Sequence, residues 1–240
     1  MKPPIENPAP LGSPAASHPS SGSPKDCHAA TKGIAFTARL LVAAAIAAFT
    51  TSCDRVKAVF YVDHMERQER TDALQVDRVI ETLRLAPGNR IADIGAGSGL
   101  FTRPMATRVR PGVVYAVDIN SKLLAHVAST AKAADLDNVR TVLASEGEPR
   151  LQEPVDVIFL CDTLHYIEAP DQYVQQFSGL VSPGGRVAIV DFHQNWPPMS
   201  HEFSAGELDA WMKRAGFELT EQHAFLPDRY LRIYGLGSSS

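Results

Sequence analysis

The stretch Asp-Ile-Gly-Ala-Gly-Ser-Gly at residues 93–99 constrains the fold of this chain more than any other feature. A mostly apolar run at 90–94 reads as a strand before it, and residues 100–106 after it can begin a helix. Glycine has no Cβ, so a glycine-rich turn lets a ligand approach the main chain closely. A strand, a glycine turn and a helix N-terminus present free N–H groups to a nucleotide-like ligand. The stretch therefore predicts an α/β fold with a ligand site at this turn.

The spacing of the glycines separates two classes of ligand. The dinucleotide fingerprint G-x-G-x-x-G would place its third glycine at position 100, where the chain has Leu100. Here the glycines alternate as G-x-G-x-G, and Asp93 stands two residues before the first of them. A second acid, Asp118, closes the next predicted strand, where its carboxylate can accept hydrogen bonds from both ribose hydroxyls. The spacing of the glycines therefore disfavours a dinucleotide.

The pattern D-x-G-x-G-x-G with a second acid closing the next strand resembles class I S-adenosylmethionine (SAM) methyltransferases. The stretches YAVDIN, VDVIFLCDTLHYI, SPGGRVAIVDF and AGFELTEQHAFLP are similar to the small-molecule branch related to ubiquinone and menaquinone C-methyltransferases. Within that branch, the chain resembles bacterial methyltransferase-domain proteins, and the resemblance covers about residues 67–236. It implies SAM as the cofactor and a small molecule as the methyl acceptor.

Alternating strand and helix patterns fill residues 61–237, which we expect to form one methyltransferase domain. Strands are expected at 90–94, 113–118, 139–143, 155–161 and 186–191, with single helices at 71–85 and 171–181. Two further strands at 217–225 and 229–236 flank Leu-Pro-Asp and predict an antiparallel hairpin. The resemblance adds the architecture, which is a Rossmann-like, doubly wound seven-stranded sheet in the order 3-2-1-4-5-7-6 with helices on both faces.

The N-terminal quarter of the 240-residue chain lacks the composition of a domain. Seven of the seventeen prolines lie in residues 1–24 among Ser, Ala and Gly, so we expect residues 1–33 to be a disordered tail. Residues 34–53 are apolar and Ala-rich and predict a signal or anchor segment. Their apolar run of ten at 40–49 fits a signal peptide better than a membrane span, which needs about twenty residues. The small residues before Cys53 resemble a bacterial lipoprotein signal, although Thr50 replaces the usual leucine.

Two arguments about localisation conflict. The segment 34–53 indicates export or membrane attachment, whereas SAM is made and kept in the cytosol, where a methyltransferase finds its donor. We therefore predict membrane association through residues 34–53, by lipidation of Cys53 or by an uncleaved anchor, with the side of the membrane left open. A cytoplasmic location is the alternative.

Composition and motifs argue against other classes of methyltransferase. The chain has 23 Lys plus Arg against 27 Asp plus Glu, so a cationic patch for nucleic acid is not expected. Enzymes that methylate amide or base amino groups carry [DN]-P-P-[YF] after the fourth strand, where this chain has Cys-Asp-Thr-Leu at 161–164. Asp162, Asp191 and Asn195 follow strands four and five, as metal ligands do in catechol-type enzymes. Such oxygen ligands at strand ends are common by chance, and we expect no metal.

The resemblance implies cofactor contacts around the glycine turn and after the second and third strands. The turn would wrap the methionine end, Asp118 would take the ribose, and Ile119 would pack on the adenine. Gln75 and nearby residues of the leading helix would close over the site, as that helix does in relatives. The predicted cofactor-binding residues are Asp93, Gly95, Ala96, Gly97, Gly99, Asp118, Ile119, Ser145 and Glu146.

The acceptor needs alignment and, in many reactions, a base. Ligands of open α/β sheets bind at the carboxyl ends of the strands, so the bases are expected there. His165 is the first choice, because the LHYI segment faces the methyl group in related enzymes. The predicted catalytic residues are His165, Asp162, Tyr166 and His193, with Asp191 and His201 as further candidate bases. For each histidine, a loop residue with a local partner is the competing interpretation.

The predicted function is SAM-dependent transfer of a methyl group to a small molecule. One alternative is a membrane-tethered, non-catalytic SAM-binding sensor or scaffold, which would need only the intact cofactor motif. The other is an NAD(P)-binding oxidoreductase, which Leu100 and the acid at Asp93 disfavour. The sequence leaves open the methylated atom and the oligomeric state.

Overall fold

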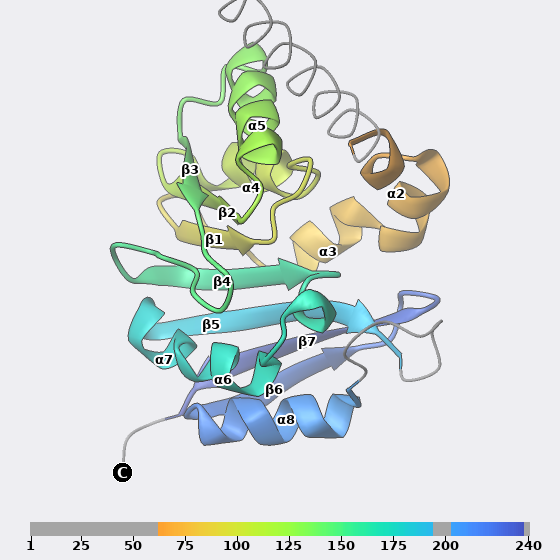
Figure 1. Cartoon of the computed structure of the whole chain (residues 1–240), viewed down its shortest axis with the longest axis vertical. Coiled ribbons are helices and arrows are strands. Elements are labelled where there is room, and N and C mark those ends of the chain that lie inside the picture. Colours follow the sequence, from red (N-terminus) through yellow and green to blue (C-terminus); the bar gives the residue numbers. More distant parts are fainter. Residues whose placement is uncertain (1–61, 194–202, 238–240) are drawn as a thin grey trace, which may run out of the picture. The chain divides into compact units, whose positions relative to one another are not determined.

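The computed structural model describes residues 62–193 and 203–237. These residues contain a seven-stranded sheet in the order β3-β2-β1-β4-β5-β7-β6 (Figure 1). Strand β7 runs antiparallel to β5 and β6, and the other neighbours are parallel. The predicted strand order is confirmed. The strands are β1 (Arg90–Ile94), β2 (Val113–Asp118), β3 (Val139–Leu143), β4 (Val155–Cys161), β5 (Val181–Phe192), β6 (Phe217–His223) and β7 (Arg229–Leu236).

Helices cover both faces of the sheet, as predicted. Buried side chains of α3 and α4, with Ala131 of α5, belong to the hydrophobic layer on one face, and those of α6, α7 and α8 belong to the layer on the other. Leu124 and Val127 of α5 pack with Ala96 and Ala116 in a smaller cluster. The helices are α2 (Gln68–Leu74), α3 (Val76–Thr82), α4 (Thr102–Val109), α5 (Ser121–Ala133), α6 (Pro170–Gln175), α7 (Phe177–Leu180) and α8 (Ala205–Arg214), with a 3₁₀ turn at Leu164–Tyr166.

The central strand β4 shows how its sequence divides between the two layers. Val157 and Phe159 pack with the residues of α3 and α4, whereas Ile158 and Leu160 pack with those of α6 and α8. All four side chains are fully buried. Since successive side chains of a strand point to opposite faces, a strand covered on both sides must be apolar almost throughout. This requirement explains the continuous apolar run from which the strand was predicted.

Three expected elements differ from the structure in their extent. The predicted helix 71–85 is divided into α2 and α3 at Gln75, whose φ of 43° lies in the left-handed region. The predicted helix 171–181 is divided at Gln176 into α6 and α7. Strand β5 begins before its predicted start at 186. Its pairing with β4 shifts register between Val155 and Val157, and this shift accommodates the Pro-Gly-Gly segment within the strand.

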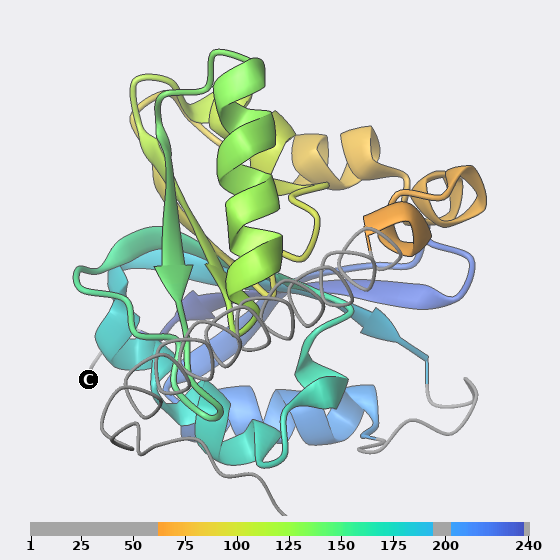
Figure 2. The same ribbon diagram turned by 45° about the horizontal axis from the view of Figure 1, so that its top comes forward.

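The parallel strands bring their carboxyl ends to one edge of the sheet. The arrowheads of β4 and β5 point to this edge in Figure 1, and α2 lies at the same end in both ribbon views (Figures 1 and 2). Because the parallel strands end there, the carboxyl edge is the place where the predicted site residues can meet.

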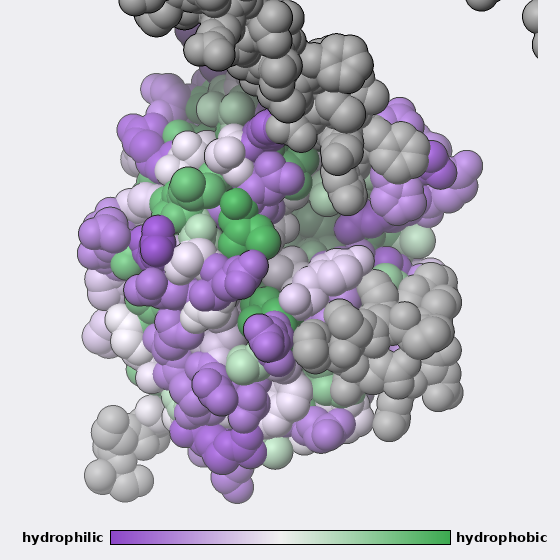
Figure 3. Space-filling model, viewed as in Figure 1, coloured by the Kyte–Doolittle hydropathy of each residue, from purple (hydrophilic) through white to green (hydrophobic). Residues whose placement is uncertain are grey.

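On the face drawn in Figure 3, apolar side chains form small patches among hydrophilic ones.

The predicted tail (1–33) and anchor (34–53) lie outside the described residues. Within residues 62–193 and 203–237, no helix combines the length and apolar character that crossing a membrane requires. Both N-terminal assignments remain predictions.

Candidate cofactor and active site

The glycine turn connects the end of β1 to α4 and is fixed on the neighbouring strand β2. The backbone N–H groups of Gly95 and Ala96 both donate to the carbonyl oxygen of Val117, at 2.8 and 3.1 Å. Gly95 and Gly97 have φ angles of 74° and 54°, which residues with a Cβ rarely adopt. The turn therefore lies beside the last residue of β2, Asp118.

Two other segments of the chain approach the glycine turn closely. A Cβ on Gly95 would lie 2.2 Å from Oγ1 of Thr163, which follows β4. A Cβ on Gly97 would lie 2.9 Å from Sδ of Met65, which precedes α2. Gly95 is therefore required by its contact with Thr163 as well as by backbone conformation, whereas Gly97 is required mainly by its left-handed φ, because the flexible end of Met65 can move aside.

A cavity of about 70 Å³ lies against the glycine turn at the carboxyl edge of the sheet. Four predicted cofactor residues line it, namely Asp93, Gly95, Ala96 and Gly97. Asp162 and Arg70 also line it, so both signs of charge are present. Cys161 forms part of the wall. Burial raises the pKa of its thiol well above the ordinary value, so Cys161 stays protonated and packs as a small residue.

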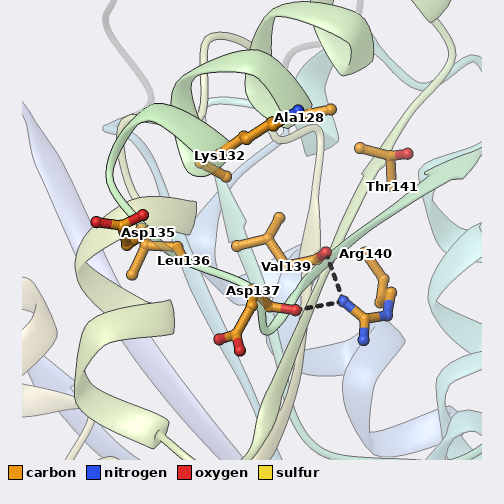
Figure 4. Close-up of a pocket in the computed structure, with 9 residues that line it drawn as sticks. Ala128, Lys132, Asp135, Leu136, Asp137, Val139, Arg140 and Thr141 are labelled. Atoms are coloured by element: carbon orange, nitrogen blue, oxygen red, sulfur yellow. Dashed lines mark hydrogen bonds between the residues drawn. The ribbon is translucent and has the colours of Figure 1, made fainter.

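A larger hollow lies elsewhere, between α5 and β3 (Figure 4), with a volume of about 640 Å³. Its floor includes the start of β3, and Arg140 there donates to the carbonyl oxygens of Asp137 and Val139, at 2.6 and 3.1 Å. None of the predicted site residues lines this hollow. Because ligands of open α/β sheets bind outside the carboxyl ends of the strands, we place the candidate site at the smaller cavity.

The side chain of Asp93, in β1 just before the glycine turn, is buried. The residue is 3% exposed, and its Oδ2 accepts a hydrogen bond of 2.5 Å from Oγ1 of Thr102. Burial disfavours the ionised carboxylate and raises the pKa of Asp93 to about 7, although the Thr102 hydrogen bond lowers it and so partly offsets burial. The cavity therefore contains a carboxyl group whose charge changes near neutral pH.

Asp118, the last residue of β2, and the residues after it lie next to the glycine turn at the carboxyl edge of the sheet. Oδ2 of Asp118 accepts from the N–H of Gly97 at 2.9 Å, and Oδ1 accepts from the N–H of Asn120 at 2.8 Å. The next residue, Ile119, is 63% exposed. The N–H of Ala144 donates to the carbonyl oxygen of Asp118 at 3.0 Å, which places the loop after β3 alongside.

The two predicted residues of that loop, Ser145 and Glu146, belong to a tight turn. Ser145 pairs with Glu148 through two backbone hydrogen bonds of 3.1 Å. The turn follows β3 at the carboxyl edge, next to the end of β2. The structure thus places all nine predicted cofactor residues along the ends of β1, β2 and β3.

Asp162, a predicted catalytic residue, is held between two arginines. Its carboxylate accepts from Arg70 of α2 at 2.8 Å and from Arg229 of β7 at 2.6 and 3.0 Å. Arg229 also pairs with Asp228 at 2.5 Å. This network joins α2 to the carboxyl edge and fixes one wall of the cavity. Sequence reasoning missed both arginines.

His165, which follows β4, pairs with the carboxylate of Asp191 near the end of β5. Its Nδ1 lies 2.7 Å from Oδ1 of Asp191, and both side chains are almost completely buried. Oδ1 of Asp191 also accepts from the N–H of Phe192 at 2.8 Å. The imidazole packs against the rings of Tyr166 and Phe192, with centroids 4.2 and 5.4 Å away. The structure therefore joins two of the candidate bases into a pair.

The other predicted acceptor-side residues are more exposed. Tyr166 is 67% exposed at the 3₁₀ turn. His193 is exposed and lies edge-on to Tyr230, with ring centroids 5.9 Å apart. His201 and Asn195 lie outside the described residues.

The leading helical segment reaches the cavity through residues near Gln75 rather than through Gln75 itself. Nε2 of Gln75 donates to the carbonyl oxygen of Phe225, at 2.9 Å, and Gln75 does not line the cavity. Met65 and Arg70 line it instead. An ion pair of 2.7 Å between Glu66 and Arg103 fastens the same segment to α4. No sequence pattern indicates these contacts, because they join residues far apart in the chain.

Comparison with known sequences adds independent information. A family model described as "Methyltransferase domain" matches residues 65–222. The ubiquinone biosynthesis O-methyltransferase of Dechloromonas aromatica is 24% identical over 192 residues, which cover 70% of this chain and 80% of that protein. The 27-O-demethylrifamycin SV methyltransferase of Amycolatopsis mediterranei is 30% identical over 138 residues. These residues cover 55% of this chain and about half (49%) of that protein.

Comparison with solved structures agrees on the fold. A SAM-dependent methyltransferase from Aquifex aeolicus superposes with a TM-score of 0.66 at 20% identity, over 73% of this chain and 96% of that one. The magnesium protoporphyrin IX methyltransferase from Synechocystis PCC 6803, solved with bound SAM, has a TM-score of 0.57 at 17% identity. That match covers 68% of this chain and 79% of the other.

Proposed function

This chain belongs to the methyltransferase-domain family, in which SAM is the methyl donor, and we propose that its acceptor is a small molecule bound at the carboxyl ends of β4 and β5. The observation that carries the proposal is the charged cavity beside the glycine turn. It lies at the edge where open α/β sheets bind their ligands.

The residues of the cavity suit the amino acid end of SAM. A free ammonium and a free carboxylate need partners of opposite charge, and the cavity offers the carboxyl groups of Asp93 and Asp162 and the guanidinium of Arg70. The glycine turn allows a ligand to lie against the main chain. Asp118, beside the turn, is placed to accept from the ribose hydroxyls, and the exposed Ile119 offers an apolar surface for adenine.

The residues that contact the methyl acceptor have a different role from those that bind SAM. SAM, when bound, supplies a methyl group already activated by its sulfonium charge. The residues of this chain therefore have to align the acceptor, exclude water and receive a proton where the acceptor loses one. We assign the proton to His165, while Tyr166 and His193 lie nearby as contacts for the acceptor. The ion pairs of Asp162 indicate a positioning role for that residue.

Calorimetric titration of the full-length chain with SAM and, separately, with NAD tests the cofactor assignment. We expect SAM to bind and NAD not to bind. Gly97→Ala should weaken SAM binding, because a residue with a Cβ rarely adopts its φ of 54° and the new Cβ would displace the end of Met65, whereas Gly179→Ala in α7 has open space around it and should bind normally. Absence of SAM binding at millimolar concentration would refute the assignment.

Incubation of the chain with labelled SAM and a bacterial cell extract, followed by mass spectrometry, tests transfer. Labelled small-molecule products are the expected outcome. SAM binding without any labelled product would instead favour the sensor or scaffold, and binding of NAD alone would favour the oxidoreductase.

We also propose that residues 34–53 attach the protein to a membrane. Support comes from the apolar run at 40–49 and from the small residues before Cys53. An acceptor that resides in the membrane would then lie close to the enzyme.

A further inference from the structure

Strand β3 forms one edge of the sheet, and β2 is its one neighbour among the described strands. At the two ends of their pairing, the N–H of Val114 donates to the carbonyl oxygen of Asn138, and the N–H of Ala144 donates to that of Asp118, both at 3.0 Å. Since the backbone groups of successive residues in a strand point to opposite sides, the even-numbered residues of β3 pair with β2. The residues whose N–H and C=O groups point away from the sheet are Val139, Thr141 and Leu143.

The opposite edge of the sheet, β6, is protected by an irregularity that β3 lacks. The pairing of β6 with β7 shifts register between Leu219 and Glu221, and Oγ1 of Thr220 donates to the carbonyl oxygen of Ile233 at 3.0 Å. A bulge of this kind bends an edge strand and hinders the addition of another strand. The register of β3 with β2 is regular, and its sequence, Val-Arg-Thr-Val-Leu, is rich in residues that favour strands. Such an edge invites strand pairing unless a charged side chain protects it.

Arg140 is the one charged residue of β3, and its side chain folds back over the outer side of its own strand. Nη1 of Arg140 donates to the carbonyl oxygens of Asp137 and Val139, at 2.6 and 3.1 Å (Figure 4). Both carbonyl groups lie at odd-numbered positions, and that of Val139 points away from β2. The guanidinium group therefore lies where an added strand would have to run.

We propose that the outer edge of β3 is a latent surface for self-association, that its occupant is β3 of a second copy of this chain, and that Arg140 keeps it closed. This inference does not depend on the proposed methyl-transfer function. The strand is self-complementary in an antiparallel arrangement. With Thr141 on the two-fold axis, Thr141 lies opposite Thr141 and Val139 opposite Leu143, so every outward-pointing residue meets another one. Leu143 is 51% exposed and would pack against Val139 of the second copy.

The contacts of Arg140 fall on the groups that this pairing needs. The N–H of Leu143 in the second copy would donate to the carbonyl oxygen of Val139, to which Arg140 already donates. The two-fold axis repeats this conflict at the other end of the paired strands. Moving the guanidinium group aside would place a charge without a partner at the interface, which is costly where water is excluded. Arg140 therefore disfavours the pairing at both ends.

Analytical ultracentrifugation of the full-length chain tests the role of Arg140. Arg140→Thr uncovers the edge, and we expect it to dimerise at least about tenfold more tightly than wild type, because two backbone hydrogen bonds per dimer become available. Lys132→Gln is the matched control. Lys132 lines the same hollow between α5 and β3, but it lies on α5, so the change removes the same charge and leaves Arg140 in place. This variant should associate like wild type.

A second substitution shows whether the dimer uses the edge of β3. Thr141→Pro removes an N–H that points away from β2, so the pairing with β2 is kept. Arg140→Thr combined with Thr141→Pro should therefore return to the wild-type dissociation constant. The inference would be overturned if Arg140→Thr associates no more tightly than wild type. It would also be overturned if Lys132→Gln or the combined variant associates as tightly as Arg140→Thr.

Amide hydrogen exchange of the dilute wild-type protein gives a readout that depends on no variant. The N–H of Thr141 should exchange rapidly, whereas that of Val142, which pairs with β2, should be protected. Protection of the Thr141 amide would mean that another strand already covers the edge, and it would overturn the assignment of Arg140 as the residue that keeps the edge closed.

Discussion

Asp93 should make the domain less stable as the pH rises toward neutrality. The carboxyl group is 3% exposed at the end of β1, and burial raises its pKa from the ordinary 3.8 to about 7. In the unfolded chain the group is solvated and keeps the ordinary value. Between these two values the folded protein therefore holds a proton that the unfolded chain has lost.

The size of the effect follows from the difference in pKa. One unit corresponds to about 1.4 kcal/mol, so a difference of about three units amounts to at most about 4 kcal/mol of unfolding free energy. The contribution of the protonated Asp93 is fully present below pH 3.8 and is lost as the pH rises through about 7. An asparagine at this position does not titrate. The free energy of unfolding of Asp93→Asn minus that of wild type should therefore grow by about 1 kcal/mol per unit between pH 5 and 7 and level off above 8.

Urea unfolding of the full-length chain and of Asp93→Asn, measured without SAM from pH 5 to 8.5, gives this difference directly. Taking the difference removes the contributions of all other titrating groups that the two proteins share. Asp77→Asn, an exposed residue of α3, is the control and should show no such trend. A difference that is the same at pH 5 and pH 8 would refute the argument that Asp93 carries a proton in the folded state.

The remaining predictions concern the ribose contact, the glycine turn and the membrane. Asp118→Ala should weaken SAM binding by about 2 kcal/mol while the fold survives, because two ribose hydroxyls lose a charged acceptor; unchanged affinity by calorimetry would mean that the ribose acid is misassigned. Gly95→Ala should destabilise the domain in urea unfolding, since its Cβ would lie 2.2 Å from Thr163, whereas Gly179→Ala should leave the stability about unchanged. In cell fractionation the full-length chain should be found with the membrane. Release only in Cys53→Ser would identify a lipid on that cysteine, and a wild-type chain wholly in the soluble fraction would contradict attachment.

The sheet could be predicted because its signals are local. The apolar run of β4 reflects burial on both faces, and the turn residues between strands mark the connections. The capping box at Ser204 and Glu207, where the two side chains and backbones bond reciprocally, begins α8 and is visible in the sequence as Ser-x-x-Glu. The break at Gln75 could not be predicted from periodicity. The apolar stripe that indicates a helix begins at Val76, after Gln75, and says nothing of the left-handed conformation that separates α2 from α3.

The cofactor side of the site and the acceptor side differ in how far the sequence reveals them. Asp93 and the glycine turn are consecutive in the chain, so their spacing alone encodes the geometry that a ligand meets. The pair of His165 with Asp191 joins residues 26 apart, and the contact of Arg70 with Asp162 joins residues 92 apart. The sequence could therefore identify candidate bases by their positions after β4 and β5, but it could not show which of them is a base and which has a structural role. Asp162 meets two guanidinium groups and His165 meets a carboxylate. A carboxylate paired with two guanidinium groups is suited to hold the cavity wall in place, whereas an imidazole oriented by an anion can take up a proton, so these partners favour His165 over Asp162 as the base that we propose.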